Sequence, residues 1–366
     1  MSGSTHGAAP PRLRADGVGF DELAQATRNH GMPLEALRYD VTPAGLHYLL
    51  IHYDVPFVDV TAWSLHLDGF DHPMTLSVDD LRARSQVTEA VTLECAGNGR
   101  AMFESRPVSQ PWLLEAVGNA EWTGVPLASV LDEAGVPGDT VEILFTGLDR
   151  GVEGGLEQSY QRSLPLEEAR RDGVLLAYEM NGQPLLPQHG APLRLVVPGW
   201  YGMTHVKWLD RIEALDHPFQ GYQHTAGYRL RSHPDDPGEP VTRILPRSLM
   251  VPPGVAGFPQ RERHLAAGRV ELEGRAWSGA AAIAQVEVST DGGTTWIDAV
   301  VDPPAGPHAW QRWHLDWTAT PGEHELACRA TDATGERQPI EATSNIGGYA
   351  NNSVHRVRVT VEDRNA

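Results

Sequence analysis

The stretch from residue 91 to residue 100, VTLECAGNGR, holds residues whose types and order could do chemistry. Val91 and Leu93 alternate with polar residues, and this pattern predicts a half-buried strand. The strand leads into Cys95, and small or turn-forming residues separate that cysteine from Arg100. A bulky cofactor could therefore approach the sulfur, with a fixed positive charge beside it. The alternative is an inert buried thiol, because most free cysteines are of that kind.

A second group of candidate residues is basic and follows later in the chain. It consists of His189, Arg194, His205 and Lys207, set among glycines, prolines and aromatic residues. Basic donors spaced along irregular backbone suit a phosphate or another polyanion. Each of them alone could equally be a solvated surface charge. The four together, in an otherwise acidic protein, indicate a pocket.

Composition limits the classes of partner. Among 366 residues, Lys+Arg of 29 against Asp+Glu of 48 gives a net charge of −19, which argues against nucleic acid and anionic membranes as partners. The two cysteines, Cys95 and Cys328, cannot form the paired motifs of covalent haem or of cysteine-rich metal clusters. Cys328 lies on the apolar face of a predicted strand and is expected to fill the core. With no membrane-length apolar run and no signal-peptide pattern, we expect a cytoplasmic protein.

The elements that must position these residues fall into two predicted domains. Residues 1–20 are expected to be a disordered leader, residues 21–235 a mixed α+β domain, and residues 236–366 a β-sandwich. In the first domain we expect helices at 21–27, capped by Asp21, and at 166–171, with strands at 63–67, 141–145 and 193–197. Prolines punctuate residues 234–259, which indicates an extended crossing between the domains.

Several motifs carry a resemblance to a known family. VTLECAGNGR, LLAYEMNGQPL and HVKWL resemble the sulfite oxidase family of molybdenum-cofactor enzymes. GRAWSG, VEVSTDGG, LACRATD and the closing HRVRV resemble the dimerisation domain of that family. The resemblance covers about residues 45–361. It implies an α+β fold, with a mixed α/β molybdopterin-binding domain followed by an Ig-like β-sandwich that forms a homodimer.

The resemblance also assigns roles to residues. It implies one molybdenum held by a single pyranopterin dithiolene and by the Cys95 thiolate, a soft ligand that suits this metal. Arg100, Tyr228 and Trp112 would face the substrate, although Trp112 could instead be a core residue. Asp149 and Ser163 could alternatively be ordinary turn residues. The positions expected to contact the cofactor are His52, Cys95, Asp149, Ser163, His189, Arg194, His205 and Lys207.

Two departures from the family pattern bear on the substrate. Leu50 and Gly347 stand where substrate-site arginines are expected, and each lost charge-assisted hydrogen bond should weaken binding of a dianion by about 1.5–3 kcal/mol. The segment Arg28-Asn29-His30 upstream could be a displaced equivalent of the missing arginine, or part of an N-terminal lid.

The function that the resemblance implies is oxidation of sulfite to sulfate by oxygen-atom transfer. No haem is expected in this chain, so electrons would pass to an external acceptor such as a cytochrome. A different reading keeps the cofactor but has the enzyme reduce S- or N-oxides, or oxidise another small oxyanion. The chain could also be a binding protein without a cofactor, or an enzyme that uses a cysteine nucleophile with a nearby histidine.

Overall fold

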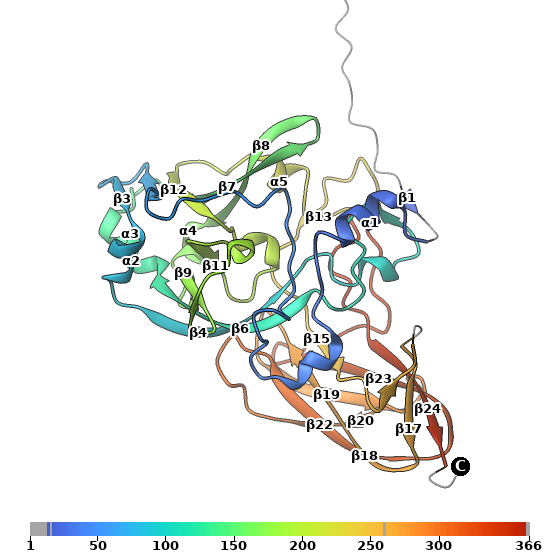
Figure 1. Ribbon diagram of the computed structural model, residues 1–366. Helices are drawn as coiled ribbons and strands as arrows, with labels where there is room; N and C mark the ends of the chain where they lie inside the picture. Colours follow the sequence, from blue (N-terminus) through green and yellow to red (C-terminus); the bar gives the residue numbers. More distant parts are fainter. Residues whose placement is uncertain (1–12, 15–16, 259–260, 364–366) are drawn as a thin grey trace, which may run out of the picture.

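The computed structural model describes residues 13–14, 17–258 and 261–363, which form a larger mixed domain and a β-sandwich (Figure 1). Most of the expected leader lies outside the described residues, but β1 (Leu13–Arg14) pairs with β5 (Arg106–Pro107). Helix α1 spans Phe20–Ala26, one residue earlier than expected. Gly19 rather than Asp21 is its N-cap, and the Glu22 carboxylate accepts a hydrogen bond from the Gly19 amide at 2.9 Å.

Two five-stranded sheets build the larger domain. The first contains β4 (Val87–Glu94), β6 (Val117–Pro126), β9 (Leu175–Met180), β10 (Gln183–Pro184) and β11 (Arg194–Val196). The second contains β2 (Leu65–Asp68), β3 (Met74–Leu76), β7 (Glu142–Glu153), β8 (Leu156–Pro165) and β12 (Leu209–Leu215). The expected strands at 63–67, 141–145 and 193–197 correspond to β2, to the start of β7 and to β11.

Short helices connect and cover these strands. The α-helices after α1 are α2 (Val78–Arg82), α3 (Leu127–Ala134), α4 (Leu166–Ala169) and α5 (Tyr222–Thr225). The 3-10 helices are η1 (Leu34–Arg38), η2 (Arg100–Met102), η3 (Pro187–His189) and η4 (Gly202–Thr204). Leu81 of α2 and Leu131 of α3 enter the main core, which fills the space between the two sheets. Among the described residues, no helix combines the length and the apolar character needed to cross a membrane.

In the β-sandwich, two sheets of mostly antiparallel strands pack face to face. One contains β15 (Arg247–Met250), β18 (Gly268–Trp277), β21 (Val300–Val301) and β22 (Gln311–Ala319). The other contains β16 (Val255–Ala256), β17 (Arg263–Ala266), β19 (Ile283–Ser289), β20 (Ile297–Asp298), β23 (Gly322–Asp332) and β24 (His355–Glu362). Cys328 is fully buried between these sheets, which confirms it as a core residue.

The crossing between the domains is extended, as the prolines predict. Its β14 (Glu239–Pro240) pairs with β13 (Arg229–Leu230), and the sandwich begins at β15. The expected domain boundary at residue 235 therefore lies before the first strand of the sandwich, which begins at Arg247.

Strand β4 differs from its prediction in one informative way. Its first residues are exposed, but Val91, Thr92, Leu93 and Glu94 are all buried, so the expected half-buried pattern is wrong at this end. The sandwich domain covers the other side, and the Thr92 amide donates to the carbonyl of His308 from that domain at 3.0 Å. The polar residues of the alternating pattern face the second domain instead of solvent.

Candidate active site

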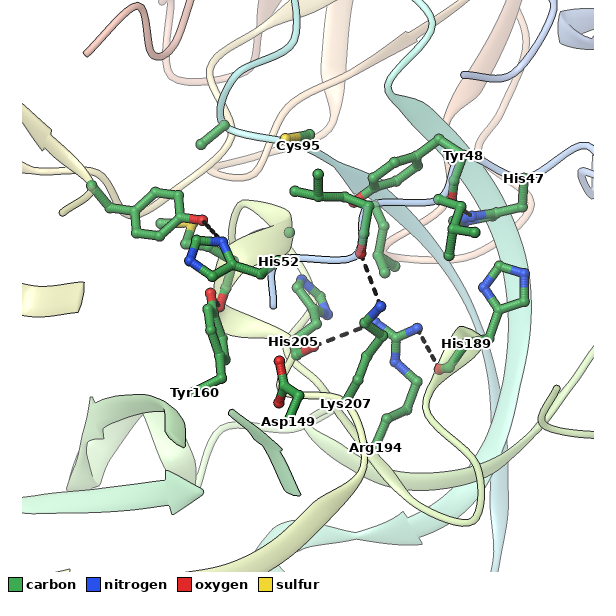
Figure 2. A pocket seen from close by; sticks show the side chains of 17 residues that line it. His47, Tyr48, His52, Cys95, Asp149, Tyr160, His189, Arg194, His205 and Lys207 are labelled. Carbon is green, nitrogen blue, oxygen red and sulfur yellow. Dashed lines mark hydrogen bonds between the residues drawn. The ribbon is translucent and has the colours of Figure 1, made fainter. Parts of the chain in front are cut away.

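A cavity in the larger domain collects most of the predicted site residues (Figure 2). Cys95 reaches it from the loop after β4, and Arg194 and Lys207 reach it from β11 and from the loop before β12. This inner cavity is also lined by His52, Asp149, His189, His205 and Tyr228. Residues far apart in sequence therefore surround one space, with the sulfur at one side and the cations at the other.

The backbone after Cys95 folds back under the sulfur. The Gly97 amide donates a hydrogen bond to Cys95 Sγ at 3.4 Å. The glycine at position 97 leaves room for the Arg100 guanidinium, because a Cβ there would lie 2.7 Å from it and would displace that side chain. Burial raises the pKa of the Cys95 thiol, and the neighbouring Arg100 acts in the opposite direction. A bound metal ion would stabilise the thiolate form that burial disfavours.

The electrostatics of the inner cavity favour an anionic ligand. Lys207 is the chain's only lysine, and burial together with Arg194 lowers its pKa to about 7. Burial also lowers the pKa of Arg194 to about 10 and that of His189 to about 3. Cations gathered away from water destabilise one another, and a bound anion would relieve that cost.

Orphaned polar atoms test whether a polar cofactor fits these residues. Within the part of the chain that the structure describes, His47 Nε2, Asp149 Oδ1 and Arg194 Nε are buried without a hydrogen-bond partner. Buried polar groups are normally satisfied, so three such atoms around one cavity require explanation. A pterin with a phosphate tail offers both donors and acceptors, and the residues present fit it.

An outer cavity of about 300 Å³ adjoins the inner one and shares Leu50, His52, Cys95 and Tyr228 with it. Arg100 and Trp112 line this outer cavity, as expected for residues that face a substrate. Trp112 is 5% exposed, so it is both buried and a cavity wall.

Arg100 is held rigidly in the outer cavity. Its Nη1 donates to Ser109 Oγ at 3.1 Å and its Nε donates to the Gly347 carbonyl at 3.2 Å. The guanidinium also lies over the ring of Tyr349, 5.0 Å from the ring centre. Gly347, which stands where an arginine is expected, thus supports Arg100 through its backbone.

The segment Arg28-Asn29-His30 lies beside Leu50. His30 and Leu49 exchange backbone hydrogen bonds at 2.8 and 3.2 Å, and the Ile51 amide donates to Asn29 Oδ1 at 2.7 Å. Asn29 Nδ2 also donates to Gln110 Oε1 at 3.0 Å. Arg28, an exposed residue, lines the outer cavity together with Leu50 and Cys95. An arginine therefore lines the outer cavity from the backbone segment that adjoins Leu50.

Comparisons with known proteins agree with this geometry. Residues 52–223 match the model of the oxidoreductase molybdopterin binding domain, and residues 254–362 match that of the Mo-co oxidoreductase dimerisation domain. Sulfite oxidase from Arabidopsis thaliana is 33% identical over 350 residues, covering 87% of this chain and 87% of the relative. The chain belongs to the sulfite oxidase family of molybdenum-cofactor oxidoreductases.

Other members of the sulfite oxidase family vary in length and activity. Human mitochondrial sulfite oxidase is 35% identical over 341 residues, and this chain spans 62% of its length. A nitrate reductase from Oryza sativa is 32% identical, with 38% of its length covered. The crystal structure of the sulfane dehydrogenase SoxCD from Paracoccus pantotrophus matches with a TM-score of 0.79 and 30% identity, covering 91% of this chain and 86% of that one. The expected family, two-domain fold and oxidoreductase class are thus confirmed.

Ser163 differs from the other residues that the sulfite oxidase resemblance assigns to the cofactor. It lies on β8, where its hydroxyl donates to Glu142 Oε2 at 2.6 Å and its amide donates to His224 Nε2 at 3.0 Å. These contacts use its polar groups in the second sheet, away from the residues that line either cavity.

Sequence reasoning missed several residues that line the two cavities. His47 and Tyr48 line the inner one, and Glu153, Gln223 and Tyr349 line the outer one. His47 lies in the apolar, histidine-containing stretch that also holds His52, which is a usable signal. Glu153 gives no such signal, because a glutamate at the end of a strand usually faces solvent.

Proposed function

We propose that this chain oxidises sulfite to sulfate and passes the electrons to an external acceptor. The observation that supports this is a single cavity lined by Cys95, Arg28 and Arg100. When bound, a molybdenum ion on a single pyranopterin dithiolene supplies oxygen-atom transfer and accepts two electrons. Cys95 would be the sulfur ligand from the protein. Arg194, Lys207 and the histidines of the inner cavity would hold the pterin and its phosphate.

The substrate anion must be bound against the field of an acidic protein with net charge −19. Arg100, fixed by three contacts, offers a charge that needs no reorganisation when the anion arrives. Arg28 adds a second charge at the cavity mouth. Oxidation consumes one water for each sulfite and releases sulfate, two protons and two electrons. The residues around the Cys95 sulfur therefore have to bind a dianion and allow protons to leave the cavity.

Assembly and electron transfer belong to the same proposal. The match of residues 254–362 to a dimerisation domain supports a homodimer through the sandwich. The electron acceptor would be a separate carrier, for example a cytochrome.

Reduction of the metal by sulfite tests the proposal directly. Protein purified from a host that makes the cofactor should contain molybdenum, and sulfite added without air should bleach its Mo(VI) absorption within the mixing time. Turnover with ferricyanide should follow. Arg100→Met should slow bleaching at low sulfite concentration, whereas Arg269→Met, on an exposed pair with Asp316 in the sandwich, should not. Molybdenum-loaded protein whose absorption sulfite leaves unchanged would contradict the proposal.

A second candidate substrate is a sulfane sulfur, such as a persulfide. Leu50 and Gly347 replace two expected cations, which suits a substrate whose reacting group carries less charge than sulfite. The similarity to the sulfane dehydrogenase SoxCD across most of both chains supports the same choice. The bleaching experiment with glutathione persulfide in place of sulfite separates the two. Reoxidation of the dithionite-reduced protein by a sulfoxide or by nitrate, without bleaching by either sulfur compound, would favour a reductase instead.

A further inference from the structure

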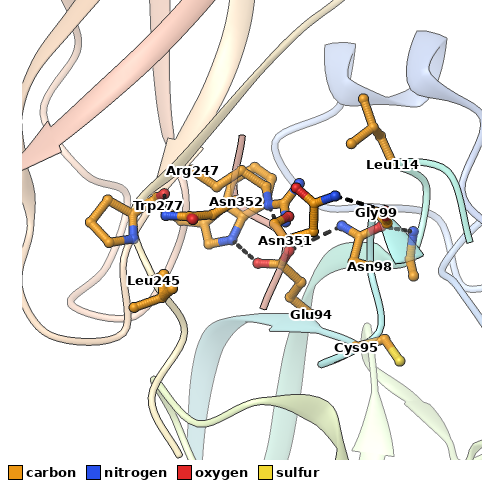
Figure 3. A network of polar contacts seen from close by, with 12 residues as sticks. Glu94, Cys95, Asn98, Gly99, Leu114, Leu245, Arg247, Trp277, Asn351 and Asn352 are labelled. Carbon is orange, nitrogen blue, oxygen red and sulfur yellow. Dashed lines mark hydrogen bonds and ion pairs between the residues drawn. The ribbon is translucent and has the colours of Figure 1, made fainter. Parts of the chain in front are cut away.

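The residue before Cys95 is a buried carboxylate that the second domain binds (Figure 3). Glu94 is 0% exposed. Its Oε1 lies 2.7 Å from Arg247 Nε, and its Oε2 accepts a hydrogen bond from Trp277 Nε1 at 2.8 Å. Both partners come from the sandwich, on β15 and β18. The strand that delivers the sulfur therefore ends on a contact with the other domain.

Glu94 also holds the loop that follows the sulfur. Asn98 Nδ2 donates to Glu94 Oε1 at 3.0 Å, and Asn98 Oδ1 accepts from the Ala116 amide at 3.1 Å. The carboxylate at the end of β4 therefore holds Asn98 of the loop, and Asn98 in turn holds the backbone just before β6. A loop of small residues has few side-chain contacts of its own, so these polar contacts fix its course.

Arg247 connects this network to a second set of contacts with the same loop. The guanidinium is 1% exposed and its Nη2 donates to the Asn351 carbonyl. The segment that holds Asn351 in turn binds the loop after Cys95. The Ala350 amide donates to the Ala96 carbonyl at 2.8 Å, and Asn351 Nδ2 donates to the Gly99 carbonyl at 2.9 Å. Arg247 is therefore linked through Glu94 to the residue before Cys95, and through the Asn351 segment to the residues after it.

An ion pair this deeply buried is a poor source of net stability, because desolvation of the two charges offsets their attraction. What such a pair can supply is position, since both groups need their partners in one geometry. A shift of about one ångström at a reacting centre can have large effects on rate. A metal ligand on a loop has the same need for a fixed support.

We infer that Arg247 and Glu94 are positioning residues that hold the Cys95 sulfur for the metal, so that the sandwich domain forms part of the active site. This inference rests on the proposed ligation of the cofactor by Cys95. It assigns to the second domain a task at the sulfur in addition to dimerisation.

The test compares two buried arginines of the sandwich that both bind the larger domain. Arg247 contacts the Cys95 loop, whereas Arg275, 2% exposed, donates to Asp40 Oδ1 at 2.9 Å and to the Arg38 carbonyl at 3.2 Å. Full-length holoprotein carrying Arg247→Gln, Arg275→Gln or Glu94→Gln is examined by amide hydrogen exchange, molybdenum content and the EPR spectrum of Mo(V). Thermal unfolding records the general loss of stability.

Arg247→Gln should raise exchange of amides 95–100 by about tenfold, as expected when a loop loses a buried charge-assisted contact, and should change the Mo(V) EPR spectrum. Arg275→Gln should raise exchange near residues 38–40 and leave the spectrum unchanged. If Arg247→Gln fails to fold, Glu94→Gln carries the same expectation, because it removes the charge and keeps the shape.

The inference would be overturned if Arg247→Gln and Glu94→Gln lowered the unfolding temperature while the loop exchange and the EPR spectrum stayed as in the parent protein. Failure of the proposed function is distinguishable from this result. If the proposed ligation is wrong, the Mo(V) EPR spectrum of Cys95→Ser should equal that of the parent protein. Hydrogen exchange in the Arg247→Gln variant would still show whether Arg247 orders the loop.

Discussion

The carboxylate of Glu153 accepts a hydrogen bond from His52 Nε2 at 2.9 Å, and the other ring nitrogen of His52 lies 3.5 Å from the Tyr228 hydroxyl. Gln223 Nε2 and the Tyr53 hydroxyl donate to the same carboxylate oxygen at 2.7 and 3.1 Å. The Glu153 side chain is 34% exposed. A line of proton-carrying groups therefore leads from the tyrosine of the site toward solvent.

This line of groups gives a prediction about proton release. Glu153→Gln should lower kcat for sulfite by about 10–100-fold, because the route loses its proton acceptor, and should leave KM nearly unchanged. The solvent isotope effect on kcat should increase. Glu157→Gln, on the same hairpin and paired with Arg150 at the surface, is the matched control. A variant at 153 with normal kcat would exclude Glu153 from proton release.

The buried lysine gives a prediction about pH. The pKa of Lys207 is lowered from 10.5 to about 7 by burial and by Arg194. Between these values the unfolded chain binds a proton at this lysine that the folded chain does not, so the stability of cofactor-free protein should rise from about pH 7 to about pH 10. Lys207→Met should flatten that rise in urea unfolding and should also reduce the retained pterin.

The control for the lysine prediction is Arg211→Met. This side chain of β12 is 41% exposed and pairs with Asp68. The variant should keep both the pH dependence and the pterin. Equal slopes of stability against pH in the parent protein and in Lys207→Met would contradict the assignment.

The N-terminal segment gives a prediction about substrate affinity. Arg28→Gln should raise KM for sulfite by about tenfold and change kcat little, because an exposed cation at the cavity mouth binds the anion before and after reaction alike. Arg269→Gln should behave like the parent protein. An unchanged KM, measured at low ionic strength where surface charge matters most, would show that Arg28 does not touch the substrate.

The sulfur itself gives the sharpest prediction. Cys95→Ser should keep the fold and the pterin but lose turnover by at least about 100-fold, because the serine oxygen replaces the soft ligand. X-ray absorption at the molybdenum edge should show one sulfur scatterer fewer than in the parent protein. Cys328→Ser should affect stability alone. Parent-like rates from Cys95→Ser would refute the assignment of the ligand.

Much of the site could be predicted because its signals are local. Cys95 directly follows a strand and precedes small residues, and the basic residues from His189 to Lys207 lie close together in sequence. Apolar and polar residues alternate along the short strands of the sandwich, and turn residues follow them, so these strands could also be predicted from sequence. Cys328 follows from such a pattern.

The features that sequence did not predict depend on contacts between distant segments. Glu94 looks like the solvent-facing member of an alternating strand, and only the arrival of Arg247 and Trp277 makes it buried. The sequence raised Arg28 as a possible replacement for the missing arginine but could not place it, because its position at the outer cavity depends on the pairing of His30 with Leu49, a bridge between two loops that no periodic pattern encodes. Ser163 has the residue type of a phosphate ligand, but its hydroxyl donates a hydrogen bond to Glu142 on the paired strand β7.

The solitary ε-amino group of this chain, on Lys207, lines the inner cavity. Amine-directed reagents, which mark many positions on most proteins, therefore have one lysine to find here, and a bound pterin would cover it. The extent of labelling at that position should serve as a gauge of how many molecules in a preparation are loaded.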